Sequence, residues 1–505
     1  MPSQLRYIKG SEILVKLKAL CANLSWLRFM ANLNPFICQL DPVLHTFDHV
    51  RETSPFLLST ILAAAAKALN PSLQSTLRDH AETLFAKAFL RGEKSASHVQ
   101  AILILTYWKE PEDTRAFVNV GLAIRVAMEL GWHNLAVHPQ PPGRSEFESR
   151  KARNIERTWL VLFVYDRSIS LQTGRPRMIE RGHFFDAVEG WYRSPLATSC
   201  DGLLCAFVSL RLLTADVPGL LRPKDGGFHG HVENHRPLMK TMENQISRWQ
   251  RQWTVALDRE RCHLFLTSFY GAHTLLLLFS LPLQSSLSCK SAPIDMEAFW
   301  ISYNAAITML ELVADESNTS SLYFAQDSVH VMIAYAAVFL IKLVLSVPGT
   351  IRHEIEATAI NSLRTASEIL SQQAAPPNTG CALQSMFLAN VLGLVEHPSK
   401  SRLARNTLQN TPGPLPGQRS DAYETPMQTT KILGRSSNET PQRISHKSNG
   451  HDAIFSKYND SSLVPDLQNF DFDDNEMWSN MFASAGFAID DGTFLPDIGG
   501  NYGPI

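Results

Sequence analysis

The sequence lacks the cysteine pattern of a secreted protein. Its seven cysteines are odd in number, and none lies in a Cys-x-x-Cys pair. Lys16 and Lys18 interrupt the stretch that would have to form the apolar part of a signal peptide. Scattered free thiols without a leader are typical of a reducing compartment, which is where we expect this chain.

The sequence also lacks an excess of charge of either sign. Its 46 Lys and Arg residues and 48 Asp and Glu residues leave a net charge of -2. This balance excludes a global basic field for nucleic acid, so any DNA contact would have to be local. Hydrophobic residues make up 45% of the 505 residues, which is the composition of an ordinary globular protein with a large core.

Motifs of the common enzyme classes are missing as well. The chain has no P-loop, nucleophile elbow, His-Glu-x-x-His helix or dinucleotide-binding glycine motif. Phe472-Asp473-Asp474 is similar to the aspartate-rich magnesium motif of helical isoprenoid synthases, but it lies in a disordered tail, outside any helical cavity. We therefore predict that the chain is not an enzyme and has no catalytic residues.

Two groups of histidines are spaced closely enough in the sequence to bind a metal ion together, but neither group supplies four ligands. His45 and His49 are four residues apart, and His229, His231 and His235 cluster in a glycine-rich loop. A structural zinc site needs four firm ligands, and no cysteine or carboxylate set accompanies either group. The prediction is that this chain has no metal site and binds no cofactor.

Period-two alternation is absent, whereas helical periodicity recurs along the chain. Ser54-Pro55 is a helix start, with serine as N-cap and proline in the first turn, and Asn70-Pro71 is the matching stop. Residues 217–237, rich in Gly, His and Pro, are predicted to form a loop. Further helices are predicted at about 73–91, 96–108, 115–130, 148–173, 199–215, 238–257, 262–281, 296–314, 327–346 and 351–373. The predicted fold class is all-α, a multi-helix domain followed by a disordered C-terminal tail.

Three of these segments are apolar around most of their circumference. Residues 269–283 and 329–347 approach the length of a membrane span, but they contain His273, Pro282, His330 and Lys342. The helix at 115–130 is also apolar on all sides, which predicts that it sits inside the domain. We expect buried helices in each case and no membrane association.

Near the N-terminus, one isoleucine and four leucines recur with the spacing of two heptads. We call them the leucine stripe, and they are Ile13, Leu17, Leu20, Leu24 and Leu27. Two heptads are fewer than a stable coiled coil usually requires, so packing of this stripe on its own domain is the favoured interpretation. A short dimer seam is the alternative.

The stretch from Arg157 to Ile179 combines a helix with a turn. Asp166 falls on the apolar face of the helix, where a carboxylate is costly unless it is paired. Arg167 and, after the turn at Gly174, Arg175 are the candidate partners, and Pro176 fixes the following backbone. We predict a buried clasp between Asp166 and these arginines that locks the turn to the helix.

The helix before this clasp has a basic start that contains Arg150, Lys151, Arg153 and Arg157. A nuclear-import signal or a phosphate-binding patch would have this composition. A solvated helix face is the favoured interpretation.

The composition changes at about residue 397. Residues 398–450 contain eight Lys and Arg against three Asp and Glu and few large apolar residues, which predicts a disordered linker. The last 55 residues reverse the charge, with ten Asp and Glu against Lys457 alone.

Aromatic residues are interleaved with the acidic residues of this tail, and they are Phe470, Phe472, Trp478, Phe482, Phe487 and Phe494. Repulsion between carboxylates keeps such a chain extended and its aromatic side chains available to a partner, as in disordered activation segments. An inert acidic tail is the alternative.

Two segments together resemble a known family. RAFVNVGLAIRVAMELGWH (115–133) and ERTWLVLFVYDRSISLQTGRP (156–176) are similar to the middle homology region of fungal zinc-cluster transcription factors. The shared features are a helix that ends in Leu-Gly-x-His, an Arg-rich helix with aromatic residues, and the Asp-Arg and Gly-Arg-Pro sequences. Ser54-Pro55-Phe56 also looks like an early helix start of that family. The resemblance spans about residues 35–375 and implies a helical regulatory domain, a nuclear location and control of transcription by RNA polymerase II.

One feature of the family is missing from the sequence. Family members bind DNA through an N-terminal cluster of six cysteines that holds two zinc ions, whereas only Cys21 and Cys38 lie in the first fifty residues. Zinc is therefore expected only if a missing cluster precedes this sequence. Otherwise the chain is a co-regulator that reaches DNA through a partner, as a homo- or heterodimer. A helical ligand-binding protein or enzyme is a third alternative.

These observations predict four regions. Residues 1–34 form an N-terminal helix that is a remnant of a dimerisation coiled coil, and 35–396 form the helical regulatory domain. Residues 397–450 form the linker, and 451–505 form the activation segment that contacts coactivators or the transcription machinery.

Overall fold

The computed structural model describes the helical part of the chain, namely residues 21–110, 113–135, 143–173, 175–215, 217, 232–257, 263, 265–288, 294–374 and 379–396. No strand occurs among these residues, so the all-α prediction is confirmed. The linker predicted at 397–450 and the acidic segment predicted at 451–505 lie outside the described residues, as do residues 1–20.

The first long helices obey the start and stop signals of the sequence. Helix α4 (Pro55–Leu69) begins after Ser54, whose hydroxyl accepts a hydrogen bond from the Leu57 amide at 3.4 Å. Asn70 follows its last residue, and Pro71 begins α5 (Pro71–Leu90). Gly92 lies just past α5 with a φ of 64°, a conformation that glycine adopts without strain. The predicted bounds of α4 are confirmed.

Short elements precede this pair, and they are η1 (Phe29–Leu33), α2 (Asn34–Ile37) and α3 (Phe47–Thr53). The helical turns before η1 pack on the domain through Trp26, and η1 itself packs through Phe29 and Leu33; all three are buried. Leu24 and Leu27 expose 52% and 57% of their surfaces instead. The prediction that the leucine stripe packs on its own domain is therefore wrong at these two positions, because another face of the helix is buried. The rest of the stripe, Ile13, Leu17 and Leu20, lies outside the described residues.

Helix α7 (Ala116–Glu129) packs on α6 (Ala96–Tyr107) with one side only. Val120 and Ile124 are buried, but Val118 exposes 69% of its surface. The prediction of an entirely internal helix is wrong, because apolar residues on the outer side face solvent. The 3-10 turn η2 (Trp132–Asn134) follows at Gly131.

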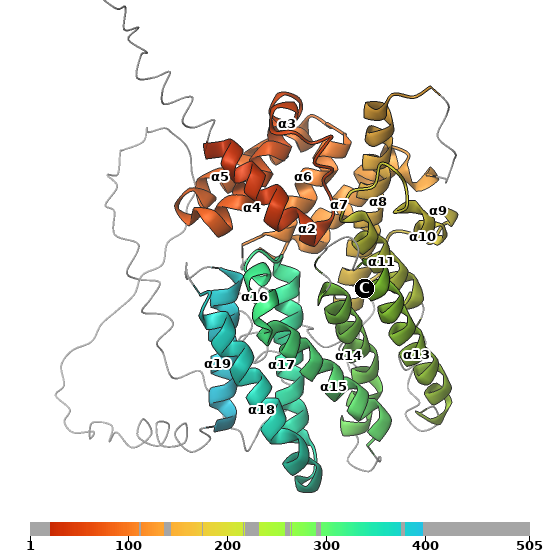
Figure 1. Cartoon of the computed structure of the whole chain (residues 1–505), viewed down its shortest axis with the longest axis vertical. Helices are drawn as coiled ribbons and strands as arrows, with labels where there is room; N and C mark the ends of the chain where they lie inside the picture. Colours follow the sequence, from red (N-terminus) through yellow and green to blue (C-terminus); the bar gives the residue numbers. More distant parts are fainter. Residues whose placement is uncertain are drawn as a thin grey trace, which may run out of the picture. The chain divides into compact units, whose positions relative to one another are not determined.

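Helix α8 (Glu146–Thr173) contacts α6 and α7, which precede it in the chain, and α11 (Asp201–Leu213), which follows it (Figure 1). The short helices α9 (His183–Asp186) and α10 (Val188–Trp191) connect α8 to α11. Residues distant in sequence therefore meet along α8, which makes this helix the place where a polar site can join several elements.

The second half of the domain is a set of long helices, which are α13 (Val232–Leu257), α14 (Phe265–Ser288), α15 (Met296–Ala314), α16 (Glu316–Leu322), α17 (Asp327–Ser346), α18 (Gly349–Ser371) and α19 (Gly380–Glu396). The bounds predicted for α15 and α17 are confirmed. Helix α13 begins inside the loop predicted at 217–237, and α19 was not predicted. The described residues up to Gly393 belong to one compact unit. A second unit begins at Leu394, and the structure describes only its first three residues, which end α19.

Helices α14 and α17 are long and apolar enough to cross a membrane by composition alone. In each, 78% of the apolar window is buried inside the protein, and α15 contacts both. The two histidines of these windows, His273 and His330, are buried as well, and Lys342 is half-buried. The interpretation of these segments as buried core helices agrees with the structure.

Helix α19 begins against the ring of His330. A Cβ added to Gly380 would overlap Nε2 of that ring, whereas a Cβ on Gly393 of the same helix would meet nothing within 4 Å. Gly380→Ala should therefore lower the free energy of unfolding by about 1–3 kcal/mol, because overpacking a buried contact is costly. Gly393→Ala should leave it unchanged or slightly raised. Urea unfolding followed by circular dichroism measures both, and equal effects would contradict the close contact.

Candidate functional site

The basic start of α8 points three arginines into the protein. Arg150, Arg153 and Arg157 follow one another at spacings of three and four, and the fully buried Leu160 continues the same face. Arg153 and Arg157 are 4% and 0% exposed. The predicted solvated face is therefore wrong for Arg153 and Arg157, because their partners lie inside the domain; Lys151 is exposed as expected.

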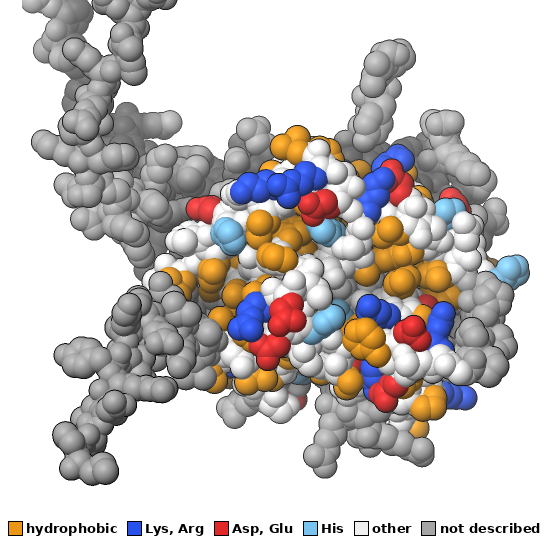
Figure 2. Space-filling model, turned by 90° about the horizontal axis from the view of Figure 1, so that it is seen from above, with side chains coloured by type: hydrophobic (Ala, Val, Ile, Leu, Met, Phe, Trp, Pro, Cys, Tyr) orange, Lys and Arg blue, Asp and Glu red, His pale blue; other side chains and the backbone are white. Residues whose placement is uncertain are grey.

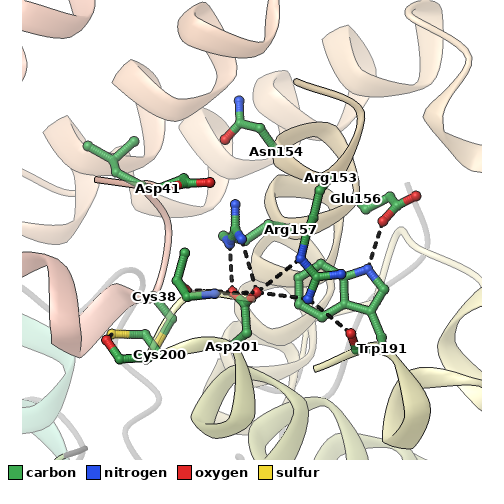
Figure 3. Close-up of polar contacts among 12 residues, drawn as sticks. Cys38, Asp41, Arg153, Asn154, Glu156, Arg157, Trp191, Cys200 and Asp201 are labelled. Carbon is green, nitrogen blue, oxygen red and sulfur yellow. Dashed lines mark hydrogen bonds and ion pairs between the residues drawn. The ribbon is translucent and has the colours of Figure 1, made fainter. Parts of the chain in front are cut away.

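Asp201, in the first turn of α11, is the carboxylate on which Arg153 and Arg157 converge (Figure 3). Its Oδ1 accepts a hydrogen bond from Arg157 Nε at 2.7 Å, and its Oδ2 accepts from Arg157 Nη2 at 3.0 Å and from Arg153 Nη2 at 2.9 Å. Thr198 donates to the same carboxylate through its hydroxyl at 2.8 Å and its amide at 3.1 Å. Both carboxylate oxygens are therefore fully engaged, and the helix N-terminus favours their negative charge.

Trp191, the last residue of α10, closes the outer side of the network. Its ring centroid lies 3.6 Å from the guanidinium carbon of Arg153, which is within the range of a cation–π contact. Its indole nitrogen donates to Glu156 Oε2 at 2.7 Å, and its carbonyl accepts from Arg153 Nη2 at 2.9 Å. The tryptophan thus covers the charged groups and fixes α10 against α8.

A second carboxylate ties the N-terminal segment to the same helix. Arg150 Nη1 donates to Asp41 Oδ2 at 3.0 Å, and Asp41 Oδ1 accepts from the Val43 amide at 2.9 Å. The Asp41 amide donates to His45 Nδ1 at 3.2 Å. Asn34 holds the preceding turn through two hydrogen bonds of 2.9 Å with the backbone of Leu40. The network of α8 therefore joins residues 34–45, α10 and α11, and we call it the arginine network.

Burial and charge have opposite effects on the titratable groups of the arginine network. Burial raises the pKa of Asp201, but hydrogen bonds and positive charge from Arg157 and Arg153 outweigh it and hold this pKa below its usual value. Burial lowers the pKa of His45 to about 4, although its contact with the Asp41 backbone acts in the opposite direction. At neutral pH the Asp201 carboxylate is thus ionised, whereas the His45 imidazole is uncharged.

The hydrogen bonds of the arginine network suit it to hold segments of the domain together. Each oxygen of Asp201 already accepts from an arginine, so this carboxylate is unsuited to act as a general base. Within the described ranges, no three His, Cys, Asp or Glu side chains are placed to hold a metal ion. His229 and His231 lie outside those ranges, as does the side chain of His235. What the network can do is fix the relative positions of three segments.

Farther along α8, the predicted clasp region has a defined geometry. Asp166 accepts hydrogen bonds from the amides of Met178 and Ile179 at 2.9 Å each, and Arg167 Nη2 donates to the Ile179 carbonyl at 3.0 Å. Burial raises the pKa of Asp166, and the two amides oppose that rise. The backbone after the turn is therefore bound by side chains of two consecutive helix residues.

Arg175 reaches a different helix with its side chain. Its guanidinium carbon lies 4.8 Å from the ring centroid of Phe117 on α7, and its carbonyl accepts from the Ser170 hydroxyl at 2.7 Å. Pro176 is exposed, and Gly174 lies outside the described residues. A direct pair between Asp166 and Arg175 stays a prediction.

The remaining predicted site residues are those of the acidic tail, Phe470, Phe472, Trp478, Phe482, Phe487 and Phe494, and all lie outside the described residues. Sequence reasoning missed Asp41, Trp191 and Asp201. An aspartate in the first turn of the predicted helix 199–215 was a signal that could have led to Asp201.

The described residues form an all-α domain organised around the arginine network, and comparison with known proteins gives its class. A family model described as the middle domain of the transcriptional activator of proteases prtT matches residues 35–376. The chain therefore belongs to this family of fungal transcription-factor middle domains. The resemblance inferred from residues 115–133 and 156–176 is confirmed.

Curated relatives are similar to part of the chain. Protein priB of Lentinula edodes is 31% identical over 318 residues, which are 62% of this chain and 52% of that protein. The transcriptional activator of proteases prtT of Emericella nidulans is 22% identical over 323 residues, 59% of this chain and 46% of that protein. The acetamidase regulatory protein of Emericella nidulans is 33% identical over 132 residues, 24% of this chain and 16% of that protein. The chain spans about half the length of priB and prtT, and no solved structure matches it.

Removing the carboxylate charge of Asp201 tests the arginine network. Asp201→Asn should lower the free energy of unfolding by about 3–5 kcal/mol, because two buried guanidinium groups lose their counter-charge. Asp186→Asn is the matched control, since Asp186 pairs with Arg181 at 2.8 Å on the surface and should change stability by less than about 1 kcal/mol. Chemical unfolding of both variants is the measurement, and a loss at Asp201 as small as that at Asp186 would refute the role of the network.

His45, beside Asp41 of the arginine network, should make the free energy of unfolding depend on pH. Its pKa of about 4 in the folded protein lies below that of an unfolded histidine, so the unfolded chain binds more protons between about pH 6.5 and 4. Stability should consequently fall as the pH falls through this window, with about 2 kcal/mol of the loss between pH 7 and 5 due to His45. His45→Gln should flatten the curve of stability against pH, whereas substitution of the exposed His80 should not. A curve that His45→Gln leaves unchanged would contradict this assignment.

Proposed function

We propose that this chain regulates transcription by RNA polymerase II in the nucleus, with residues 35–396 as the regulatory domain and 451–505 as an activation segment. The observation that carries the proposal is the family match over residues 35–376. The relatives named above as a transcriptional activator of proteases and an acetamidase regulatory protein support a role in transcription. A nuclear location follows from that role.

The activation segment is proposed from its chemistry. Its ten carboxylates are interleaved in the sequence with Phe and Trp residues. Aromatic side chains between negative charges suit an apolar groove with a basic rim, which a coactivator or the transcription machinery would supply.

DNA contact is proposed to depend on something beyond the described domain. On the face shown in Figure 2, basic and acidic side chains both lie among apolar ones. A neutral mixture of this kind does not attract the phosphate backbone. DNA would therefore be bound by a zinc cluster outside this sequence or by a partner protein, and the chain would act as a co-regulator in the second case. An in-frame exon with Cys-x-x-Cys-x(6)-Cys upstream of Met1 would distinguish the two.

Dimerisation is part of the proposal. Leu24 and Leu27 belong to the leucine stripe and remain half exposed in the described domain. Apolar residues with heptad spacing that do not pack on their own domain are suited to a seam with a second helix, from another copy or from a relative.

The experiment that tests the proposed function is activation of a reporter by tethered protein. Both the full chain and residues 451–505 alone, fused to a heterologous DNA-binding domain, should activate the reporter. Replacing Phe472, Trp478 and Phe482 together by alanine should reduce activation to background, because the partner groove loses its aromatic ligands.

The control replaces three polar residues of the same segment, Ser479, Asn480 and Ser484, by alanine and should retain activation. Immunoblots establish equal amounts of each fusion. If the wild-type fusions are inactive, or if the aromatic and polar replacements behave alike, the activation segment is refuted.

A further inference from the structure

Arg211 on α11 is a buried cation that has no counter-charge among the residues the structure describes. It is 2% exposed, and its Nε donates to the Ser168 hydroxyl of α8 at 3.1 Å. Its Nη1 has no hydrogen-bond partner. Among the described residues, no carboxylate pairs with Arg211, whereas the comparably buried Arg78 and Arg157 pair with Asp113 and Asp201.

This arrangement is costly unless something else neutralises the charge. An ionised group buried without a partner loses its hydration and gains no Coulomb energy in return. Burial lowers the pKa of Arg211 to about 10, so the guanidinium still carries its charge at neutral pH. A planar guanidinium is the group that best matches a carboxylate, and Nη1 of Arg211 is a donor that the described residues leave without a partner.

The surroundings of Arg211 are aromatic and contain two further polar atoms without partners. Its guanidinium carbon lies 6.0 Å from the ring centroid of Tyr270 on α14, which also packs on Phe207 at 4.6 Å. Gln326 donates from Nε2 to the Tyr270 hydroxyl at 3.3 Å, while its Oε1 has no partner. His273, one turn after Tyr270, has an unpartnered Nδ1, and its pKa is lowered to about 3 by burial and by the charge of Arg211.

We propose that Arg211 anchors a binding site for a small organic carboxylate between α8, α11 and α14. The guanidinium binds the carboxylate, and the rings of Tyr270 and Phe207 border the apolar body of the ligand. Helix α11 contacts both α8 and α14, so a ligand there bridges the half of the domain that holds the arginine network and the half built from the long C-terminal helices. An effector of this class would stabilise the regulatory domain by binding only its folded form.

Thermal unfolding of the full chain with matched probes tests the site. Hexanoate should raise the melting temperature by on the order of 3 °C at a concentration of about 100 times its Kd. Hexanamide, which has the same chain without the charge, and sodium chloride or phosphate at equal ionic strength should not. Because the wild-type chain alone gives this comparison, the result does not depend on how a variant folds, and it is independent of the reporter assay.

Variants then assign the effect to Arg211. Arg211→Met removes the charge but retains an unbranched side chain that can fill the buried position. It should weaken hexanoate binding by about 10- to 100-fold, as expected for loss of a charge-assisted pair. Arg125→Met, on the exposed side of α7, is the control and should bind as the wild type does. Absence of a hexanoate shift in the wild type, an equal shift with hexanamide, chloride or phosphate, or an unchanged shift in Arg211→Met would each overturn the proposal.

Discussion

The pairing of buried arginines with Asp201 is the constraint on which the arrangement of this domain depends. Arg153 and Arg157 lie on α8, and Asp201 begins α11, so the fully buried carboxylate can be satisfied only when the two helices meet in one register. Hydrophobic packing tolerates sliding and repacking, whereas a bidentate ion pair does not. We infer that the arginine network specifies how the helices dock, in addition to whatever stability it contributes.

Most of the fold was predictable because helices are encoded locally. The Ser54-Pro55 start, the Asn70-Pro71 stop and the bounds of α15 and α17 followed from caps and periodicity, which depend on a few neighbouring residues. The exposure of helix faces was less predictable. Val118 and Leu24 face solvent because tertiary packing selected another side of each helix, and an apolar residue by itself does not reveal which side that is.

The candidate sites were predictable only in part, since they depend on contacts between distant residues. The sequence pointed to the helix-turn junction at Asp166, whose carboxylate binds the amides of Met178 and Ile179. Arg157 looked like one of several solvated basic residues, because its partner Asp201 is 44 positions away. Arg211 gave no signal at all, since its lack of a carboxylate partner among the described residues is visible only in three dimensions.

A double-mutant cycle between Arg157 and Asp201 tests the central claim most directly. The free energies of unfolding are compared for Arg157→Met, Asp201→Leu and the double variant. If the pair fixes α8 on α11, the coupling energy should be about 2 kcal/mol or more, so that the double variant loses less stability than the sum of the two single losses. A coupling energy below about 0.5 kcal/mol, with additive losses, would contradict the account.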